Sequence, residues 1–322
     1  MLTQRLSNPC GRFSAGRVWR VTTMSLLFGM LASGCSIKKI AINKIGDALA
    51  GGGTTFASDD DPELVRDALP FSLKLMESLL AEAPRHRGLL LASASGFTQY
   101  AFAFIQQDAD EIEPQDLSAA IALKGRARRL YLRARNYGLR GLETAHPGFE
   151  AALRAGPESA VAAARAADVP LLYWTAASWA SAITLSKDTP DLVAEQPIVE
   201  ALIDRALQLD EDFDNGAIHS FLISYEMARQ GVPGDPAVRA RKHFDRAMEL
   251  SGGLLAGPLV SYVEAVSIPQ ENRKEFESLL NRALAIDPNA RTEFRLANLI
   301  MQRRARWLLS RIDDLILSPE TM

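Results

Sequence analysis

Residues 276–288, with the sequence FESLLNRALAIDP, decide the fold that we expect for this chain. Phe276, Leu280 and Ala283 lie three and four residues apart, so they share one face of an α-helix. Pro288 follows that pattern at the distance where a helix must stop. The stretch therefore predicts a helix whose apolar face packs against a neighbouring helix and which ends in a short turn.

The same spacing recurs upstream, which indicates an internal repeat. Matching positions are Ala240, Phe244 and Ala247; Val199, Ile203 and Ala206; and Ala127, Tyr131 and Ala134. From Ala206 to Ala247 is 41 residues and from Ala247 to Ala283 is 36, near the 34-residue tetratricopeptide unit. Any amphipathic helix can supply one such match by chance. Four matches at these separations favour degenerate tetratricopeptide pairs over a generic helical array.

The rest of the body has the period of helices and few strand patterns, so we predict an all-α solenoid of helical hairpins. A first helix starts at Asp61-Pro62, and its two adjacent apolar stripes, containing Phe71 and Leu73, predict that it is covered on two sides. Further helices are expected at 86–107, 117–144, 147–154, 157–168, 170–186, 195–209, 215–230, 236–250, 255–267, 271–286 and 290–315.

The first 35 residues have the pattern of a lipoprotein leader. Arg17 and Arg20 precede an apolar run at 21–31, which is shorter than the roughly 20 residues that a membrane-spanning helix needs. Ala32-Ser33-Gly34-Cys35 resembles a lipobox whose large aliphatic residue lies one place early. We predict cleavage before Cys35 and lipidation of its thiol; the alternative is an ordinary buried helix. Ser36 in place of an aspartate favours the outer membrane over the inner one.

This prediction divides the chain into a signal peptide at 1–34, a lipidated N-terminus and linker at 35–58, and a tetratricopeptide-like domain at 59–318. No segment after the leader is expected to span a membrane. Residues 1–34 hold four arginines and no acid, so the mature chain keeps 32 basic and 39 acidic residues and a net charge near −7. An acidic balance argues against a nucleic-acid partner. The other cysteine, Cys10, lies in the leader.

No pattern typical of catalysis is present. The four histidines, His86, His146, His219 and His243, lack metal-ligand spacing, and we expect each at the surface or capping a helix. There is no GxSxG nucleophile motif, and 51–55 lacks the lysine of a phosphate-binding loop. Acidic residues 59–61 fit a solvated helix start better than a cation site. We therefore expect no enzyme, no cofactor and no metal.

Three groups of residues are candidates for binding. Phe97, Tyr100 and Phe104 share a helical face among small residues, and they either fill the core or line a cavity. Trp174 and Trp179 lie about 140° apart on a helix, so at most one need face a cavity. The stripe of Arg126, Arg129, Arg133 and Arg140 suits carboxylate binding or a solvated face. A charged last helix, with Arg303, Arg304, Arg306, Trp307 and Arg311, predicts a cap on the open end of the solenoid.

Several longer strings resemble the T component of tripartite ATP-independent periplasmic (TRAP) transporters. They are GTTFASDDDPELV at 53–65, LPFSLK at 69–74, GFTQY at 96–100, YLRAR at 131–135, LYWTAASW at 172–179 and RRARWLL at 303–309. The resemblance spans nearly all of the mature chain.

It implies a periplasmic lipoprotein of tetratricopeptide repeats that trimerises and associates with the solute-binding subunit, which serves a membrane permease. It also implies a hydrophobic cavity for an apolar or organic-acid ligand. Our candidates for its lining are Phe97, Tyr100, Phe104, Tyr131, Arg133 and Trp174. A lipid-anchored scaffold for envelope or outer-membrane assembly is the alternative function, and an enzyme is a distant third.

Overall fold

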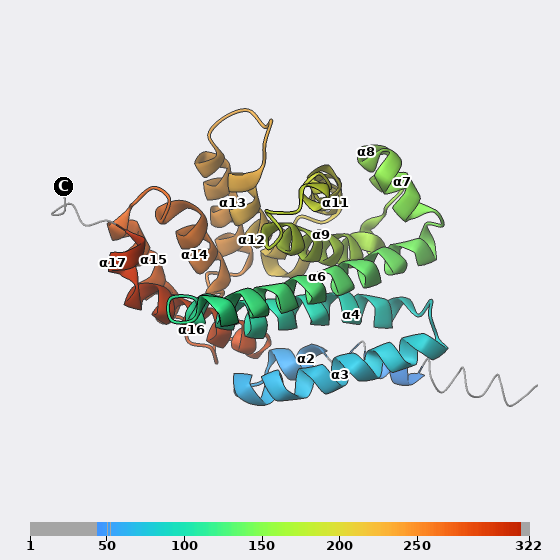
Figure 1. Cartoon of the computed structure of the whole chain (residues 1–322), viewed down its shortest axis with the longest axis horizontal. Helices are drawn as coiled ribbons and strands as arrows, with labels where there is room; N and C mark the ends of the chain where they lie inside the picture. The colour runs from blue at the N-terminus through green and yellow to red at the C-terminus, as the bar shows by residue number, and fades with distance from the viewer. Residues whose placement is uncertain (1–43, 50, 52, 317–322) are drawn as a thin grey trace, which may run out of the picture. The chain divides into compact units, whose positions relative to one another are not determined.

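Helices and turns make up the described part of the chain, which is residues 44–49, 51 and 53–316 of this computed structural model (Figure 1). No strand occurs in those residues, which confirms the predicted all-α class. The predicted leader and its lipidation site, Cys35, lie outside them. Tetratricopeptide pairing of the helices stays a prediction.

Most helices lie within a few residues of the expected ranges. The α-helices are α2 Gly53–Ala57, α3 Pro62–Glu82, α4 Arg87–Tyr100, α5 Gln107–Ile112, α6 Leu117–Ala145, α7 Phe149–Ala155, α8 Pro157–Val161, α9 Val169–Thr184, α10 Pro190–Val193, α11 Gln196–Leu209, α12 Phe213–Ala228, α13 Pro236–Leu250, α14 Gly257–Tyr262, α15 Arg273–Leu284, α16 Arg295–Ser310 and α17 Ile312–Leu315. Between these lie two π-helices, η1 Ala101–Gln106 and η3 Val263–Ser267, and two 3₁₀ turns, η2 Ala166–Asp168 and η4 Thr292–Phe294. Residues 44–49 and 51 are also helical.

Local chemistry explains where the longer helices start. The Asp61 carboxylate accepts hydrogen bonds from the backbone N–H groups of Glu63 and Leu64, and Pro62 occupies the first turn of α3. Asp116 caps α6 through the N–H of Ala119. The single helix predicted at 157–168 is wrong, because α8 ends at Val161 and a turn separates it from η2.

Successive helices pack on one another, from α3 on α4, α4 on α6, α6 on α9 and α9 on α11 to α12 on α13 and α15 on α16. The positions that defined the repeat lie in these contacts, since Phe276, Leu280 and Ala283 are all buried. So are the other nine: Ala127, Tyr131, Ala134, Val199, Ile203, Ala206, Ala240, Phe244 and Ala247. The apolar spacing in the sequence therefore marks the faces where helices meet.

The described residues cover one apolar stripe of α3 and only part of the other. Its Leu73, Met76 and Leu80 are buried against the α4 side, whereas Leu64 and Phe71 are 58% and 72% exposed. The expectation that both stripes are covered is therefore wrong within the described range. The reason is position, because α3 lies at the edge of the stack and the stripe of Leu64 and Phe71 is covered only near its end, where Leu79 packs against the cluster of Leu80 and Leu89.

Helix α4 continues through η1 into α5 without a break, so this helical run extends to residue 112 instead of 107. The run at 87–112 is long and apolar enough to span a bilayer, which corrects the expectation that no segment after the leader has these properties. Most of its apolar window is buried inside the protein, as in the core helix of a water-soluble domain.

The last long helix does more than cover an open end. Helix α16 contacts α2 and α3 as well as α14 and α15, and Arg295 donates a hydrogen bond to the carbonyl of Ser58 at 2.9 Å (Figure 1). This corrects the prediction of a solvated terminal cap. The end of the helical array returns to its beginning, because Arg303 and Arg304 find acidic partners on earlier helices.

Helices α6 and α9 approach closely because two glycines face α9. A Cβ atom at Gly138 would lie 2.1 Å from Oγ1 of Thr175 and 3.3 Å from its Cα. At Gly141 it would lie 2.5 Å from Leu171. Close backbone approach therefore requires the absence of side chains at these two positions.

We predict that Gly138→Ala lowers the free energy of unfolding by about 1–3 kcal/mol, because the methyl group collides with backbone and side chain of α9. Gly125→Ala, earlier on the same helix, is the matched control. Its nearest neighbour would be the Arg129 guanidinium at 3.7 Å, so it should raise stability by roughly 0.5–1 kcal/mol through helix propensity. Urea unfolding measures both, and equal effects of the two variants would contradict the packing argument.

Candidate functional site

The exposed side of α6 carries a row of arginines. Arg126, Arg129, Arg133 and Arg140, which we call the arginine face, are all solvent-exposed. The opposite side of α6, including Ala127, Tyr131 and Ala134, is buried. The helical period of the sequence therefore places these four arginines on the side of α6 opposite the buried residues.

A shallow hollow of about 460 Å³ lies on this face. It is lined by Arg129, Leu132, Arg133, Asn136, Tyr137 and Arg140, all of them from α6. Three guanidinium groups and the amide of Asn136 are polar groups of its lining, and Leu132 and Tyr137 supply an apolar part. Such a lining suits a carboxylate, since arginine binds the two oxygens of a carboxylate in a fork geometry.

Two aromatic rings hold two of these arginines in place. Phe97 of α4 and Tyr137 of α6 stack with their centroids 5.9 Å apart. The Arg133 guanidinium lies over the Phe97 ring at 5.4 Å, and that of Arg140 lies over Tyr137 at 5.2 Å. Arg140 also donates to the carbonyl of Pro84 at 3.1 Å. These contacts restrict the two side chains before any ligand arrives.

Glu77 of α3 is the carboxylate beside this stack. It accepts a hydrogen bond from the Tyr137 hydroxyl at 2.8 Å and lies 3.5 Å from Arg133. Burial alone would raise the pKa of Glu77, but hydrogen bonds from Lys74 and Tyr137 and the charge of Arg133 lower it below the usual value. Burial and the bond to Glu77 raise the pKa of Tyr137 to about 12. One negative charge therefore faces the arginine row.

The structure brings two of the predicted binding residues, Phe97 and Arg133, into direct contact. Phe97, Tyr100 and Phe104 are buried in the core formed with Val65 and Leu73. None of the three lines the α6 hollow. Their place in the described chain is that of packed interior side chains.

Tyr131 and Trp174 lie elsewhere. Tyr131 is fully buried, and its hydroxyl donates to the Gln106 side chain at 2.7 Å. Trp174 is half-buried on α9 and meets Tyr173 edge to face at 4.9 Å. Trp179, by contrast, is completely buried and donates its indole N–H to Glu195 at 2.8 Å. The two tryptophans therefore face different surroundings, as their separation on the helix predicts.

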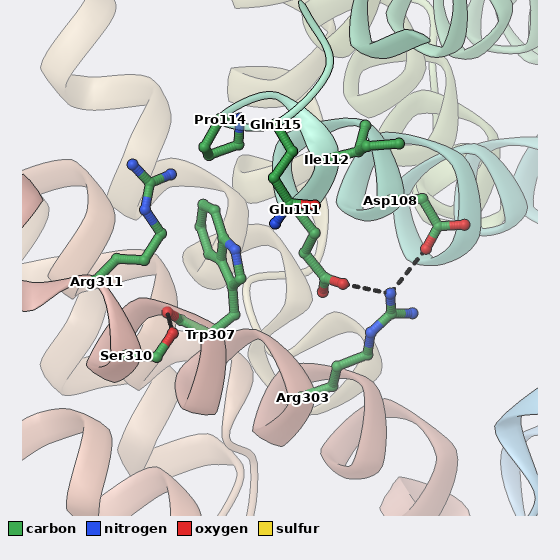
Figure 2. Close-up of a pocket in the computed structure, with 9 residues that line it drawn as sticks. All are labelled: Asp108, Glu111, Ile112, Pro114, Gln115, Arg303, Trp307, Ser310 and Arg311. Carbon is green, nitrogen blue, oxygen red and sulfur yellow. Dashed lines mark hydrogen bonds and ion pairs between the residues drawn. The ribbon is translucent and has the colours of Figure 1, made fainter.

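A second hollow, of about 570 Å³, lies where α5 and the turn after it meet α16 (Figure 2). In Figure 2 the Arg303 side chain points toward Asp108 and Glu111, to which it donates hydrogen bonds of 2.8 and 2.6 Å. Arg66 of α3 binds both oxygens of the same Asp108 at 2.5 and 3.1 Å. The sequence predicts only a terminal cap for Arg303, because acidic partners nearly 200 positions away cannot be recognised from spacing.

The side chain of the next residue, Arg304, forms a second set of ion pairs. Its guanidinium lies 3.0 Å from Asp110 of α5 and 2.6 Å from Glu264 of η3. Its charge also lies 4.4 Å from the centre of the Trp307 ring. Because every acid in this group has a cationic partner, the hollow beside α16 is primarily a structural junction.

The histidines fall into two groups. His86 caps α4 through the N–H of Leu89, and His146 follows the end of α6 and bonds Asp168 at 2.9 Å. His219 of α12 is buried, which corrects the expectation that it lies at the surface or caps a helix. Its Nδ1 lies 2.8 Å from Nδ1 of His243 on α13, so one ring donates and the other accepts.

This pair generates a pH prediction. Burial, and for His243 also the nearness of His219, lowers the pKa of both rings, that of His243 to about 4. The folded protein therefore favours the neutral rings. Their contribution to stability should be complete above about pH 6.5 and should be lost as the pH falls from there toward 4.

Proton NMR titration of the histidine rings measures this shift. We expect His243 to titrate near pH 4 in the folded chain and near its ordinary value of about 6.5 in urea. Titration of His243 near 6.5 in both states would contradict the pairing with His219.

Comparison with known proteins gives two matches. A family model described as TRAP transporter T-component matches residues 58–316. An uncharacterized protein of Treponema pallidum (strain Nichols) is 30% identical over 316 residues, covering 92% of this chain and 98% of its own length. The family match includes α3 through α17, and therefore the arginine face and both hollows.

Proposed function

The chain belongs to the family of TRAP transporter T-components, and we propose that it docks the solute-binding subunit of such a transporter and holds or passes its ligand. The observation that carries this proposal is the extent of the family match, residues 58–316, which includes helices α3 through α17. An accessory transporter subunit works through binding. The α6 surface, with exposed arginines ordered by aromatic rings, suits that role.

The ligand class that we propose is an organic acid with an apolar part. In this proposal Arg133 binds the carboxylate of the ligand at the surface. Its guanidinium lies over the ring of Phe97, which belongs to the aromatic core. Phe97, Tyr100, Phe104, Tyr131 and Trp174 remain our candidates for contacting the apolar part. Because four of these five are buried, this role requires helices α4 and α6 to separate when the ligand enters.

We further propose that the protein is tethered in the periplasm. In this proposal residues 1–34 are removed, Cys35 is lipidated, residues 35–58 link the anchor to the domain at 59–318, and the anchored protein forms a trimer. Two or more acyl chains would hold it stably on a membrane, which we take to be the outer one because Ser36 follows the lipidated residue.

Cys35→Ala tests the tether. We expect a folded protein that is released into the soluble periplasmic fraction, because its only attachment to the lipid phase is lost. Fractionation with immunoblotting measures this, and Cys10→Ala, inside the predicted leader, is the matched control that should stay on membranes. Retention of the Cys35→Ala protein on washed membranes would refute the lipid anchor.

Co-purification tests the proposed partner. When the tagged, lipidated protein is solubilised from membranes in mild detergent, we expect the solute-binding subunit of a TRAP transporter to elute with it. Deletion of the gene should abolish uptake of that subunit's ligand while the cell envelope keeps its integrity. A general envelope defect without any such partner would favour the scaffold function instead.

A further inference from the structure

The arginine face has few internal partners for its positive charge. Arg126 and Arg129 make no hydrogen bond or ion pair with any residue in the described ranges, and Arg133 has Glu77 alone, at 3.5 Å. Arg140 bonds a backbone carbonyl, which carries no net charge. Many other arginines pair with acids, as Arg66, Arg303 and Arg304 show. Arg128 and Arg306 also make no hydrogen bond or ion pair within the described ranges, but they lie outside the row. The row on α6 differs because it gathers four exposed arginines with little acidic pairing on one face of one helix.

This row of arginines lies on an acidic protein. The mature chain that we predict carries 32 basic and 39 acidic residues, so its net charge would repel another acidic protein. A local row of four exposed arginines reverses that field over one surface. Such a row guides a negatively charged partner to one orientation and raises the rate of association.

The dimensions of the row favour a macromolecule over a single carboxylate. Arg126 and Arg140 are fourteen positions apart, which corresponds to about 21 Å along the helix axis. All residues that line the hollow come from this one helix, so no second element of the described chain closes around a ligand there. An exposed row of this length matches several carboxylates spread over a protein surface.

Two members of the row are ordered in advance. Arg133 rests on Phe97, and Arg140 rests on Tyr137 and bonds the carbonyl of Pro84. Long side chains normally lose conformational freedom when they are immobilised in an interface, at a cost of about 0.5–1.5 kcal/mol each. Because this ordering is already present, contacts to these two arginines cost less on binding.

We propose that the arginine face of α6 is the docking surface for an acidic face of the transporter's solute-binding subunit. This inference rests on the proposed function and adds the surface and the chemistry of recognition. Carboxylates of the partner pair with Arg126, Arg129, Arg133 and Arg140, and Asn136 and Leu132 lie between them. Since the contacts are exposed, salt weakens the complex.

The test uses the full, lipidated chain in detergent and the purified solute-binding subunit encoded for the same transporter. Binding is measured by surface-coupled kinetics at about 50 and 300 mM salt. The key variant, Arg126→Gln with Arg129→Gln, removes two arginines without internal partners, so the fold should be kept. The matched control is Arg128→Gln with Arg306→Gln, two arginines outside the row that likewise have no internal partner.

We expect the key variant to weaken binding about tenfold at low salt, chiefly by slowing association, and to reduce the loss of affinity between the two salt concentrations. Adding Arg133→Gln and Arg140→Gln should weaken binding further. The control variant should bind like the unmodified protein.

Unchanged affinity and unchanged salt dependence in the key variant would overturn the docking surface while leaving the proposed function intact, because the unmodified pair still binds. Failure of the unmodified pair to bind would overturn both. Vesicles that contain phosphatidylglycerol form a further arm with the Cys35→Ala protein. Vesicle binding that depends on Arg126 and Arg129, with no effect of these residues on the solute-binding subunit, would assign the face to a membrane and overturn the proposal.

Discussion

The ion pairs of Arg303 and Arg304 determine how the helical array ends. Arg303 reaches Asp108 and Glu111 of α5, and Arg304 reaches Asp110 of the same short helix and Glu264 of η3. Three separate segments of the chain, α5, η3 and α16, thus share one group of ion pairs. Arg66 adds α3 to this group through Asp108. Partly buried charges cost free energy unless they are paired. The pairing therefore specifies one docking geometry for α16.

The neighbours of α6 limit the surface of this helix that remains free. Helix α6 packs on α4 over its small residues and Tyr131, and approaches α9 closely at Gly138 and Gly141. Tyr137 joins it to α3 through Glu77. With these three neighbours in place, one face of α6 is left to solvent, and it is the face that carries Arg126, Arg129, Arg133 and Arg140.

The aromatic residues and the arginines perform different tasks in the folded chain. Phe97 and Tyr137 form a stacked pair between α4 and α6, and the guanidinium groups of Arg133 and Arg140 lie on that pair. The interior thus positions the surface charges. A change in the packing of α4 on α6 would move both arginines, which couples the state of the core to the arrangement of the arginine face.

The helical class, most helix ranges and the buried repeat positions, such as Phe244, Ala247 and Phe276, could be predicted from the amino-acid sequence alone. These features depend on local spacing and capping, which a single helix already contains. The long matched strings likewise indicated the family.

Other features became visible only in the folded chain. Leu64 and Phe71 stay exposed, His219 contacts His243, and Arg303 closes a junction instead of capping an open end. The folded chain also shows which aromatic residues are buried and that Phe97 supports Arg133. Periodicity shows which face of a helix is apolar or charged, but the partner of that face is set by long-range packing, and residues about 200 positions apart leave no local pattern by which they can be paired.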